Sequence, residues 1–365
     1  MQRNIAVVFG GISNENEISV ITGTMAANVL KSGGETVVPL YISQKGEIYT
    51  GAGLADINNF KNGNFTVFPR AIVAKGGIYV LNKHGRPKKF VKIDVAVNCC
   101  HGGWGEGGGV CGLFALNCIP LASAGMFESA AFMDKYYTKL VLGALDIKVA
   151  PYVYIRNASD FKEAERLGYP LIVKPAKLGS SIGIELAENG GELEEAVQAA
   201  FFYDDGVIAE KFLQDRREIN CAAYYSGGKV ITSECEEAFT KGDILSYDDK
   251  YAGGGSSVLP ADIPAETAAE IKGITERVYT KLNMRGIVRF DFIISRGEVY
   301  LSEINTVPGS LSYYLLSSGF KDFYPVMQAV IVQALDDYAL ASEKKILDTG
   351  ILNNLPNGSS KLGKK

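Results

Sequence analysis

Long apolar runs, paired cysteines and a large net charge are all missing from this sequence of 365 residues. Nowhere do 18 apolar residues follow one another, as a membrane-spanning helix requires, and the run Ile5–Phe9 is too short for the core of a signal peptide. The 37 basic and 41 acidic residues leave a net charge of -4, which gives no electrostatic footprint for nucleic acid or an anionic membrane. We therefore predict a cytoplasmic protein that binds neither nucleic acid nor membrane.

Ligands for a soft metal are scarce as well. None of the six cysteines forms a C-x-x-C pair, and His84 and His101 are the only histidines, so the sequence predicts a reduced protein without structural zinc. Glycine, in contrast, is abundant, because 41 residues in 365 is about 11% where about 7% is usual. This abundance indicates many tight turns or positions where the backbone approaches a ligand closely.

The length of the chain predicts two or three domains. The pattern of predicted strands and helices changes near residue 125. Up to residue 125, strand and helix signals alternate, which favours an open, mostly parallel α/β sheet; from residue 126, longer helices and hairpins indicate α+β structure. Predicted strands cover 4–9, 36–42, 93–100, 170–174, 207–212 and 218–225, with a return strand from Ile182, and predicted helices cover 17–30, 129–142, 192–202, 265–282 and 324–340. The sequence does not assign secondary structure to the segment 45–77, and the tail from Leu352 is predicted to fray.

The segment from Ile287 to Ile304 predicts a β-hairpin with one polar face. Ser295-Arg296-Gly297 indicates a three-residue loop with glycine at its left-handed last position, which pairs Ile294 with Glu298. In that register one face carries Arg289, Asp291, Glu303 and Asn305, and the other carries Val288, Phe290, Phe292, Ile294, Tyr300, Ile304 and the single polar residue Ser302.

Two carboxylates and an amide on that face are hard oxygen ligands of the kind that suits Mg²⁺. The arginine would then remain for developing negative charge. A surface hairpin held by exposed ion pairs is the alternative, but the apolar reverse face and the following turn, 305–309, favour the metal site.

Two segments are candidates for phosphate binding, and neither is a Walker motif. Gly103, Gly105 and Gly108 form a G-x-G-x-x-G with Glu128 twenty residues beyond, which is typical of a dinucleotide site, yet Glu106 stands where a pyrophosphate should lie. The better candidate is 174–183, where a lysine ends a strand and a Gly-Ser-Ser loop offers backbone N–H groups and hydroxyls. A solvated hairpin loop is the alternative there.

Eight short motifs succeed one another between Ile5 and about Leu316. They are Val8-Phe9-Gly10-Gly11 with Ser13 and Glu15, His101-Gly102-Gly103-x-Gly105-Glu106, Met133-Asp134-Lys135, Lys174 to Gly183, Glu210-Lys211-Phe212-Leu213, Tyr247-Asp248-Asp249-Lys250-Tyr251, Arg289-x-Asp291, and Glu303-x-Asn305-Thr306-x-Pro308-Gly309. In this order they resemble the D-alanine:D-alanine ligases of the ATP-grasp superfamily. The resemblance implies a three-lobed ATP-grasp fold with a Rossmann-like N-terminal α/β domain over 1–125, a central lobe over 126–213, a C-terminal lobe over 214–342 and a flexible tail over 343–365.

The same resemblance implies that ATP lies between the central and C-terminal lobes. Lysines would contact its phosphates, Glu210 with the Lys211 and Leu213 backbone would hold adenine beside Phe212, and Glu218 would take the ribose, although the link from Leu213 is one residue longer than usual. The implied ATP contacts are Lys135, Lys174, Ser181, Glu210, Lys211, Phe212, Leu213, Glu218 and Lys250, and the implied ligands of two Mg²⁺ ions, or of Mn²⁺ in their place, are Asp291, Glu303 and Asn305.

The implied chemistry starts from a carboxylate, a poor electrophile that ATP converts to an acyl phosphate. By analogy, Arg289 and the N–H of Gly309 would stabilise the tetrahedral oxyanion that forms when a second amino acid attacks. Glu15, oriented through Ser180 and Tyr251, would pair with the donor ammonium. Tyr251 belongs to the loop 241–257, which would close over the intermediate and exclude water. The alternative roles, which take no part in the reaction, are a helix cap for Glu15 and solvated surface positions for Lys135, Lys250 and Tyr251.

Departures from the family pattern cluster on the acceptor side. His101 would lie near the donor carboxylate, but Tyr314 stands where the family has a serine that helps hold the acceptor carboxylate, so Ser310 or Ser312 would take over. Gly107 and the segment 114–116 also replace acidic residues of the family pattern. Lys250-Tyr251 favours an amine acceptor, and D-serine stays open beside D-alanine.

We therefore predict an ATP- and Mg²⁺-dependent ligase that makes D-alanyl-D-alanine for peptidoglycan, as a homodimer through the first lobe. One alternative is a dipeptide ligase with another small acceptor. A second is an NAD-linked oxidoreductase that uses the G-x-G-x-x-G loop, and a third is a nucleotide-binding regulator without catalysis.

Overall fold

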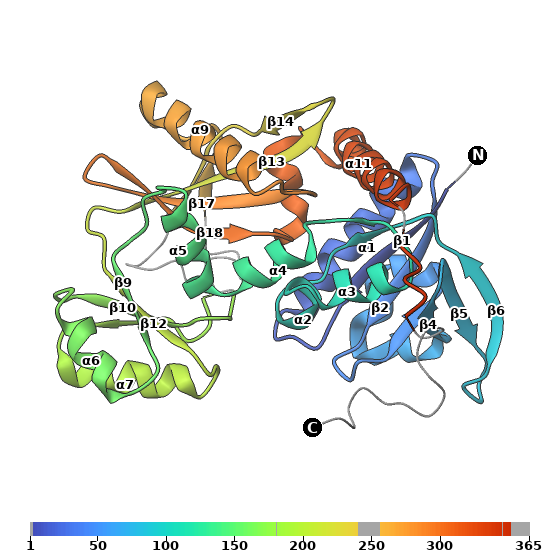
Figure 1. The fold of residues 1–365 in the computed structure, drawn as a ribbon, viewed down its shortest axis with the longest axis horizontal. Helices are drawn as coiled ribbons and strands as arrows, with labels where there is room; N and C mark the ends of the chain where they lie inside the picture. Colours follow the sequence, from blue (N-terminus) through green and yellow to red (C-terminus); the bar gives the residue numbers. More distant parts are fainter. Residues whose placement is uncertain (1–2, 180, 240–255, 345, 352–365) are drawn as a thin grey trace.

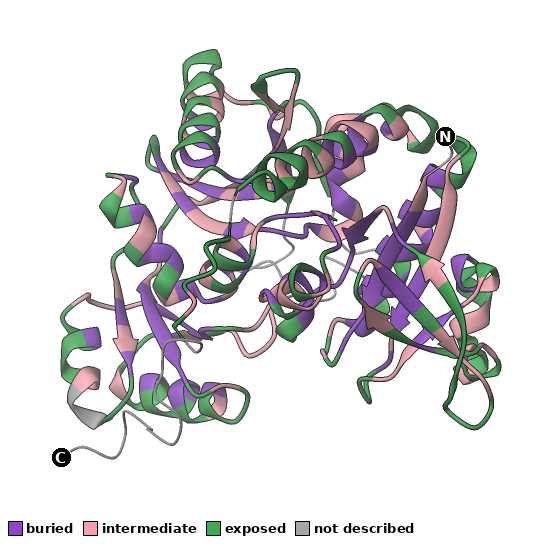
Figure 2. Ribbon diagram, turned by 45° about the vertical axis from the view of Figure 1, so that its right-hand side comes forward, coloured by how far each residue is buried: buried purple, intermediate pink, exposed green. Residues whose placement is uncertain are grey.

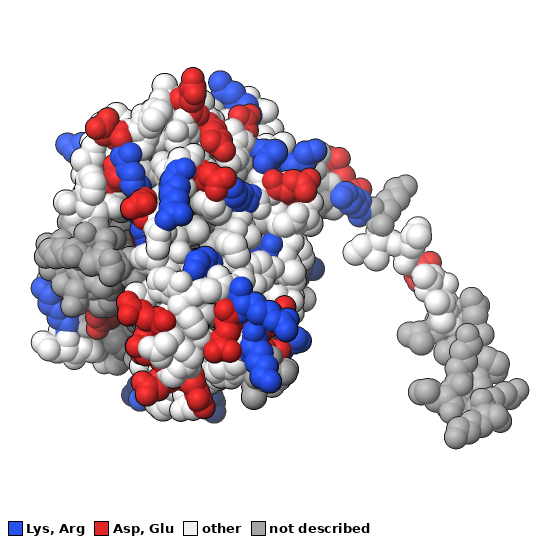
Figure 3. Space-filling model, turned by 90° about the vertical axis from the view of Figure 1, so that its left-hand side faces the viewer, with Lys and Arg blue, Asp and Glu red and all other residues white. Residues whose placement is uncertain are grey.

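The computed structural model describes residues 3–179, 181–239, 256–344 and 346–351, and within them the strands form three sheets. Figure 1 shows an eight-stranded sheet at the right, a four-stranded sheet at the lower left, and a third sheet of six strands between and above them. None of the helices in this described part of the chain combines the length and the apolar character that a bilayer crossing demands. On the face in Figure 3, acidic and basic side chains are interspersed, so that face offers nucleic acid no extended basic surface.

The first sheet confirms the predicted α/β character of the N-terminal segment. Its parallel part comprises β1 (Asn4–Gly10), β2 (Thr36–Ile42), β7 (Val95–Asn98) and β8 (Leu121–Ala122), with α1 (Asn16–Ser32) joining β1 to β2. The segment 45–77, which the sequence left open, starts an antiparallel extension made of β3 (Ile48–Thr50), η1 (Ala52–Ala55), η2 (Ile57–Val67), β4 (Arg70–Ala74), β5 (Gly77–Leu81) and β6 (Pro87–Lys92). Two short helices, α2 (Gly103–Glu106) and α3 (Gly109–Leu116), follow β7.

The helix predicted over 129–142 is in fact two helices, α4 (Met126–Met133) and α5 (Lys135–Ala144). The break falls at Asp134, whose backbone is extended and whose carboxylate accepts hydrogen bonds from the N–H groups of Tyr136 and Tyr137 at 2.8 and 3.3 Å. Aspartate at this position caps the new helix. The N–H of Lys135 then donates to the carbonyl of Ala176 at 2.8 Å, which anchors α5 beside the Gly-Ser-Ser loop.

The central sheet has helices packed on one of its two faces. Its strands are β9 (Tyr152–Ile155), β10 (Leu171–Pro175), β11 (Glu185–Ala187) and β12 (Val207–Lys211), and its helices are α6 (Ala158–Glu165) and α7 (Gly190–Phe201). The predicted return strand therefore starts at Glu185 rather than at Ile182. Alternate residues such as Val173 and Ala209 pack under the helices, so Lys174 and Glu210 lie on the opposite face.

The third sheet, like the central one, has helical cover on one face. It contains β13 (Arg217–Ser226), β14 (Lys229–Thr232), β15 (Glu236–Phe239), β16 (Ser256–Val258), β17 (Val288–Ser295) and β18 (Glu298–Asn305), and α9 (Ala265–Lys281) packs on one face. Figure 2 shows the strand interiors buried and the outer helix faces exposed. The segment after β18 forms η3 (Gly309–Ser312), α10 (Tyr313–Leu316), η4 (Phe320–Phe323) and α11 (Tyr324–Ser342).

The predicted hairpin register is wrong, although its polar face survives. Ser295 pairs with Glu298 across a two-residue turn in which Arg296 and Gly297 both have positive φ, as a type I′ turn requires. A bulge then leaves Ser302 unpaired, so Asp291 pairs with Glu303 and Arg289 with Asn305. Because of this shift, Val299 and Leu301 join the apolar core, and Tyr300 leaves it for the opposite face.

The end of the chain returns to the first lobe, where α11 lies beside α1 and β1 (Figure 1). Met327 and Ile331 of α11 belong to the same buried cluster as Val7 and Phe9 of β1 and Leu30 of α1. Arg3, Glu35, Tyr324 and Gln328 add a hydrogen-bonded ion pair at the edge of this contact. The core of the first lobe is therefore completed from the far end of the sequence.

Candidate active site

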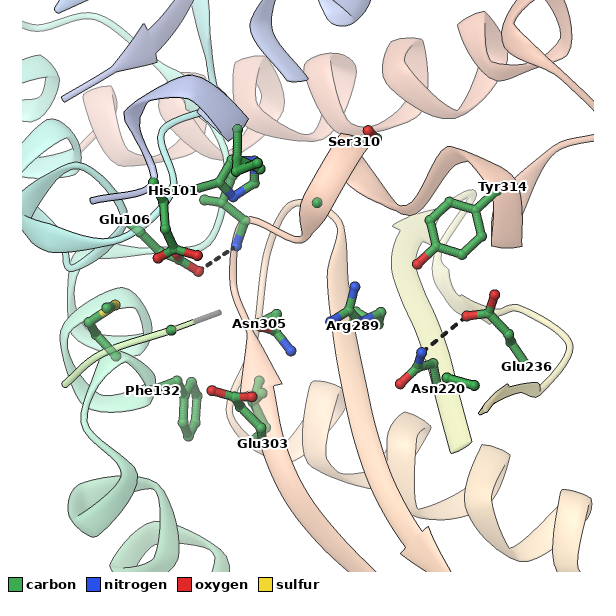
Figure 4. A pocket seen from close by; sticks show the side chains of 18 of the residues that line it. His101, Glu106, Phe132, Asn220, Glu236, Arg289, Glu303, Asn305, Ser310 and Tyr314 are labelled. Carbon is green, nitrogen blue, oxygen red and sulfur yellow. Dashed lines mark hydrogen bonds between the residues drawn. The ribbon is translucent and has the colours of Figure 1, made fainter. Parts of the chain in front are cut away.

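All three lobes contribute to one cavity of about 430 Å³. Its lining includes Glu15, His101 and Glu106 from the first lobe, and Arg289 and Glu303 from β17 and β18 (Figure 4). A second cavity of about 110 Å³ adjoins it and shares several lining residues with it. The predicted site residues that line the second cavity are Lys135, Lys174, Ser181, Glu218, Arg289, Asp291 and Glu303.

Glu15 occupies the N-cap position of α1, but its side chain makes no capping hydrogen bond. Its N–H donates to the hydroxyl of Ser13 at 3.0 Å. A Cβ atom on Gly102 would lie 2.5 Å from one carboxylate oxygen of Glu15, and a Cβ atom on Gly179 would lie 2.8 Å from it. Gly102 also has a positive φ of 66°, which favours glycine there. The Gly-Ser-Ser loop and the loop after β7 meet at this carboxylate.

His101 is buried between the first lobe and the turn that follows β18. Its N–H donates to Ser19 Oγ at 2.8 Å, and its Nε2 lies 2.8 Å from Thr22 Oγ1. That hydroxyl also accepts the N–H of Ser310 at 3.0 Å. Burial lowers the pKa of His101 to about 4, against a hydrogen bond to the Val307 backbone that raises it. The ring is therefore neutral at pH 7 and ties the two lobes together.

Glu106 lines the cavity, although sequence reasoning used it only as part of a family motif and as an objection to a dinucleotide site, and gave it no role in the site. Burial raises its pKa to about 8, helped by the nearby carboxylates of Glu15 and Glu303 and opposed by the N–H groups of Gly102 and Val307 at 2.8 and 3.4 Å. The side chain is therefore protonated at neutral pH. It fills the loop where a pyrophosphate would have to bind, which argues against the NAD interpretation.

The polar face of the hairpin is assembled around Asp291. Arg289 donates two hydrogen bonds to its carboxylate, at 2.7 and 2.8 Å, and the amide of Asn305 donates a third at 2.9 Å. Glu303 lies 3.6 Å from the ammonium of Lys135. In the described ranges no group of three or more His, Cys, Asp or Glu side chains could hold a metal ion, so any ion here would rely on Asp291, Glu303, the amide and ligand oxygens.

A buried cluster of three charges lies on the face of the central sheet opposite α6 and α7. Glu210 is 2.9 Å from the ammonium of Lys174 and 3.1 Å from that of Lys139. Burial alone would raise the pKa of Glu210, but the two lysines outweigh it and lower the pKa to about 2. Burial lowers the pKa of Lys139. Sequence reasoning missed Lys139, whose signal was its position four residues after Lys135 on one helix face.

The remaining predicted nucleotide contacts follow β12. The ammonium of Lys211 donates to the carbonyls of Gly168 and Tyr169 at 2.8 and 3.0 Å, so only its backbone is left for a ligand. Leu213 is buried, the guanidinium of Arg216 lies 5.9 Å from the ring of Phe212, and Arg216 also pairs with Glu218.

The segment predicted to bind the second amino acid has a strained backbone. Ser310, Leu311 and Ser312 have φ values of 48°, 49° and 49°, a conformation that costs energy in residues other than glycine. Gly309, Ser310 and Tyr314 line the main cavity. Ser312, in contrast, is fully buried, its hydroxyl has no hydrogen-bond partner, and it is absent from the described lining of both cavities. The structure therefore does not bring Ser312 to the site.

Three predicted site residues, Ser180, Lys250 and Tyr251, lie outside the described residues, as do most of the predicted closing loop and the tail from Leu352.

Comparisons with known proteins give a consistent result. Residues 4–124 match the family model described as D-ala D-ala ligase N-terminus, and residues 141–323 match D-ala D-ala ligase C-terminus. A D-alanine--D-alanine ligase of Thermosipho africanus is 38% identical over 348 residues, which cover 92% of this chain and 94% of the relative.

Two solved structures have folds similar to that of this chain over most of their length. The D-alanine-D-alanine ligase of Helicobacter pylori superposes with a TM-score of 0.74 at 27% identity, over 91% of this chain and 98% of that one. A D-Ala:D-Ser ligase of Enterococcus faecalis superposes with a TM-score of 0.78 at 26% identity, over 92% and 100%.

Proposed function

The chain belongs to the D-alanine–D-alanine ligase family, and from this premise we propose that it joins two D-alanines, at the expense of ATP, into D-alanyl-D-alanine for peptidoglycan. The observation that carries the proposal is that Glu15 and Arg289 line one cavity, and that the phosphate-side lysines Lys135 and Lys174 line the adjoining one. An amino-acid site and a nucleotide site in contact are what this reaction needs.

ATP is the first substrate, and the face of the central sheet opposite α6 and α7 supports its binding. Lys135 and Lys174 would neutralise phosphate charge, and Ser181 with the backbone of the Gly-Ser-Ser loop would donate to phosphate oxygens. Glu210 would accept a hydrogen bond from the adenine amino group, for which it would have to share a carboxylate that pairs with Lys139 and Lys174 in the structure. The Lys211 and Leu213 backbone, Phe212, Glu218 and Lys250 complete the proposed site.

The hairpin fits divalent metal ions, because Asp291, Glu303 and Asn305 offer hard oxygen atoms beside the phosphate-side cavity. We propose two Mg²⁺ ions, or Mn²⁺ in their place. Bound there, they would neutralise negative charge on the phosphates during transfer. Asp291 is engaged by Arg289 in the structure, so this arginine and a cation would compete for the same carboxylate.

The reaction would proceed in two steps. The carboxylate of the first D-alanine, whose ammonium pairs with Glu15, attacks the terminal phosphorus of ATP, and ADP leaves from the acyl phosphate that forms. The amine of the second D-alanine then attacks the acyl carbon, and phosphate leaves with the electron pair of the broken C–O bond. Arg289 and the N–H of Gly309 would stabilise the oxyanion.

The other cavity residues would support these steps. Neutral His101 would lie at the donor carboxylate, and Ser310 at the acceptor. Ser180 and Tyr251 would orient Glu15.

The test is phosphate release from ATP and Mg²⁺ in the presence of D- and L-amino acids, singly and in pairs, with mass spectrometry of the products. Release with D-alanine alone, accompanied by the dipeptide, is the expected result. A requirement for a second, different amino acid would replace the proposed acceptor, and no release with any amino acid would refute the ligase.

We extend the proposal to a cytoplasmic homodimer that associates through the first lobe. The need for ATP supports the location. Ile72, Tyr79 and Phe90 are paired neighbours across β4, β5 and β6, and all three are exposed, which supports a contact between two copies at these outer strands. Light scattering should give twice the mass of one chain, and Tyr79→Lys should halve it.

A further inference from the structure

Glu236 is a buried carboxylate at the opposite end of the cavity from His101 and Glu106 (Figure 4). It begins β15, is 6% exposed, and accepts a hydrogen bond from the amide of Asn220 at 3.0 Å. In the described part of the chain no lysine, arginine or histidine lies within ion-pair distance of it. A buried carboxylate whose one partner among the described side chains is a neutral amide is costly, so this wall of the cavity is suited to receive a cation.

The strand register shows that this carboxylate is separate from the metal ligands. Glu236, Asn220, Asp291 and Glu303 are paired one after another across β15, β13, β17 and β18. With strands about 4.8 Å apart, Glu236 lies roughly 10 Å from Asp291 along this row. An ion held by Asp291 and Glu303 is therefore beyond its reach, and its cation must be another one.

The groups that face Glu236 leave room for a small cation. Tyr314 of α10 hydrogen-bonds with Arg289, and burial raises the pKa of its phenol, which therefore stays neutral. Arg289 is already committed to Asp291. Ala238 of β15 and Ser257 of β16 complete this end of the cavity. The neighbouring Glu237, in contrast, is bound by two hydrogen bonds from Arg217, both 2.6 Å long.

We propose that Glu236 is a catalytic residue of the acceptor side, which binds the ammonium group of the second amino acid and takes one proton from it. This inference rests on the proposed function. Glu15 lies near Gly102 and Glu106 and serves the first ammonium, while Glu236 at the opposite end of the cavity serves the second. The ligand class is a primary ammonium of a small amino acid.

The protons balance in this scheme. An ammonium group has no lone pair, so it must lose one proton, here to Glu236, before its nitrogen can attack the acyl carbon. The C–N bond then forms, the C–O bond to phosphate breaks, and the second proton leaves the nitrogen with the departing phosphate. Glu236 returns its proton to solvent when the dipeptide leaves.

Hydroxylamine separates this role from a structural one, because it is uncharged at neutral pH and attacks an acyl phosphate without first losing a proton. Glu236→Gln keeps the shape of the side chain and should lower dipeptide formation by roughly 10²- to 10⁴-fold, the usual contribution of a positioned base. Formation of D-alanyl hydroxamate from D-alanine, ATP and hydroxylamine should stay within about twofold of the wild type, as expected if the first step is intact.

The matched control is Glu237→Gln, an identical change at the next residue, which should leave the ratio of dipeptide to hydroxamate unchanged. Equal loss of both products in Glu236→Gln, or a wild-type rate of dipeptide formation, would overturn the inference. If Glu236→Gln does not fold, Glu236→Asp should lower the ratio instead, and an unchanged ratio would overturn the inference equally. Wild-type protein that makes hydroxamate but no dipeptide would refute the proposed acceptor rather than the role of Glu236.

Discussion

Replacing Glu210 with glutamine tests the charge cluster of the central lobe most directly. The change keeps the size of the side chain but leaves the ammonium groups of Lys139 and Lys174 without their shared counter-charge. Removing one partner of a buried ion pair costs about 3–5 kcal/mol. The lowered pKa of Glu210 indicates a free-energy cost of similar size. A fall from 4.5 to about 2 corresponds to about 3 kcal/mol at ~1.4 kcal/mol per pKa unit.

Thermal unfolding measures this cost. At about 2–4 °C per kcal/mol, Glu210→Gln should lower Tm by roughly 6 °C or more. Lys139→Met is the matched control, because it removes the lysine whose pKa burial has lowered and leaves Glu210 paired with Lys174. It should change Tm by less than about 3 °C, and the double variant should recover part of the loss. A Glu210→Gln variant as stable as the wild type would refute the reasoning.

The pH dependence of the same pair gives an independent check. The folded-state pKa of Glu210 lies below its unfolded value of about 4.3, so the stabilisation is present above that pH and is lost as the pH falls toward 2. The difference in stability between wild type and Glu210→Gln should therefore shrink as the pH is lowered from about 5. A difference that stays constant over this range would contradict the assignment.

Three further predictions concern the main cavity. Arg289→Met should lower kcat for dipeptide formation by roughly 10²- to 10³-fold in steady-state assays, because it removes an oxyanion donor, and a kcat near the wild-type value would argue against that role. His101 has a folded pKa of about 4 against about 6.5 unfolded, so stability should fall as the pH drops through this interval, and His101→Gln should flatten that slope in urea unfolding. Glu106 has a folded pKa of about 8, above its unfolded value of about 4.3, so its contribution is fully present below about pH 4.3 and should be lost as the pH rises from there to about 8. A Tm series from pH 6 to 9 should show a flatter curve for Glu106→Gln, and parallel curves would count against a protonated side chain.

Most elements could be predicted because their patterns are local. The alternation of apolar residues and the glycines at element ends located β1, α1, β10 and α9 to within a few residues. The break at Asp134 could not, since 129–142 keeps a helical pattern without proline and the break depends on a capping hydrogen bond. The bulge at Ser302 depends on how β18 packs against the rest of the third sheet, which no local pattern contains.

The candidate site divides in a similar way. The polar face of the hairpin followed from strand periodicity, and most other residues followed from family resemblance. Glu106, Lys139 and Glu236 were missed because a charged residue in a sequence looks the same whether it is solvated or buried. Glu106 and Glu236 are distinguished from ordinary surface charges by their place in the wall of the main cavity, and Lys139 by its burial beside Glu210.

Because α11 contributes to the core of the first lobe, that core can be completed only after α11 has been synthesised. Val7 and Phe9 emerge from the ribosome some 320 residues before Met327 and Ile331, which belong to the same buried cluster. At about 5–20 residues per second, the wait is on the order of 15–60 s. During this time the apolar face of the first sheet lacks its cover. Molecular chaperones should therefore bind the nascent first lobe longer than the central lobe, whose core is drawn from 153–209 alone.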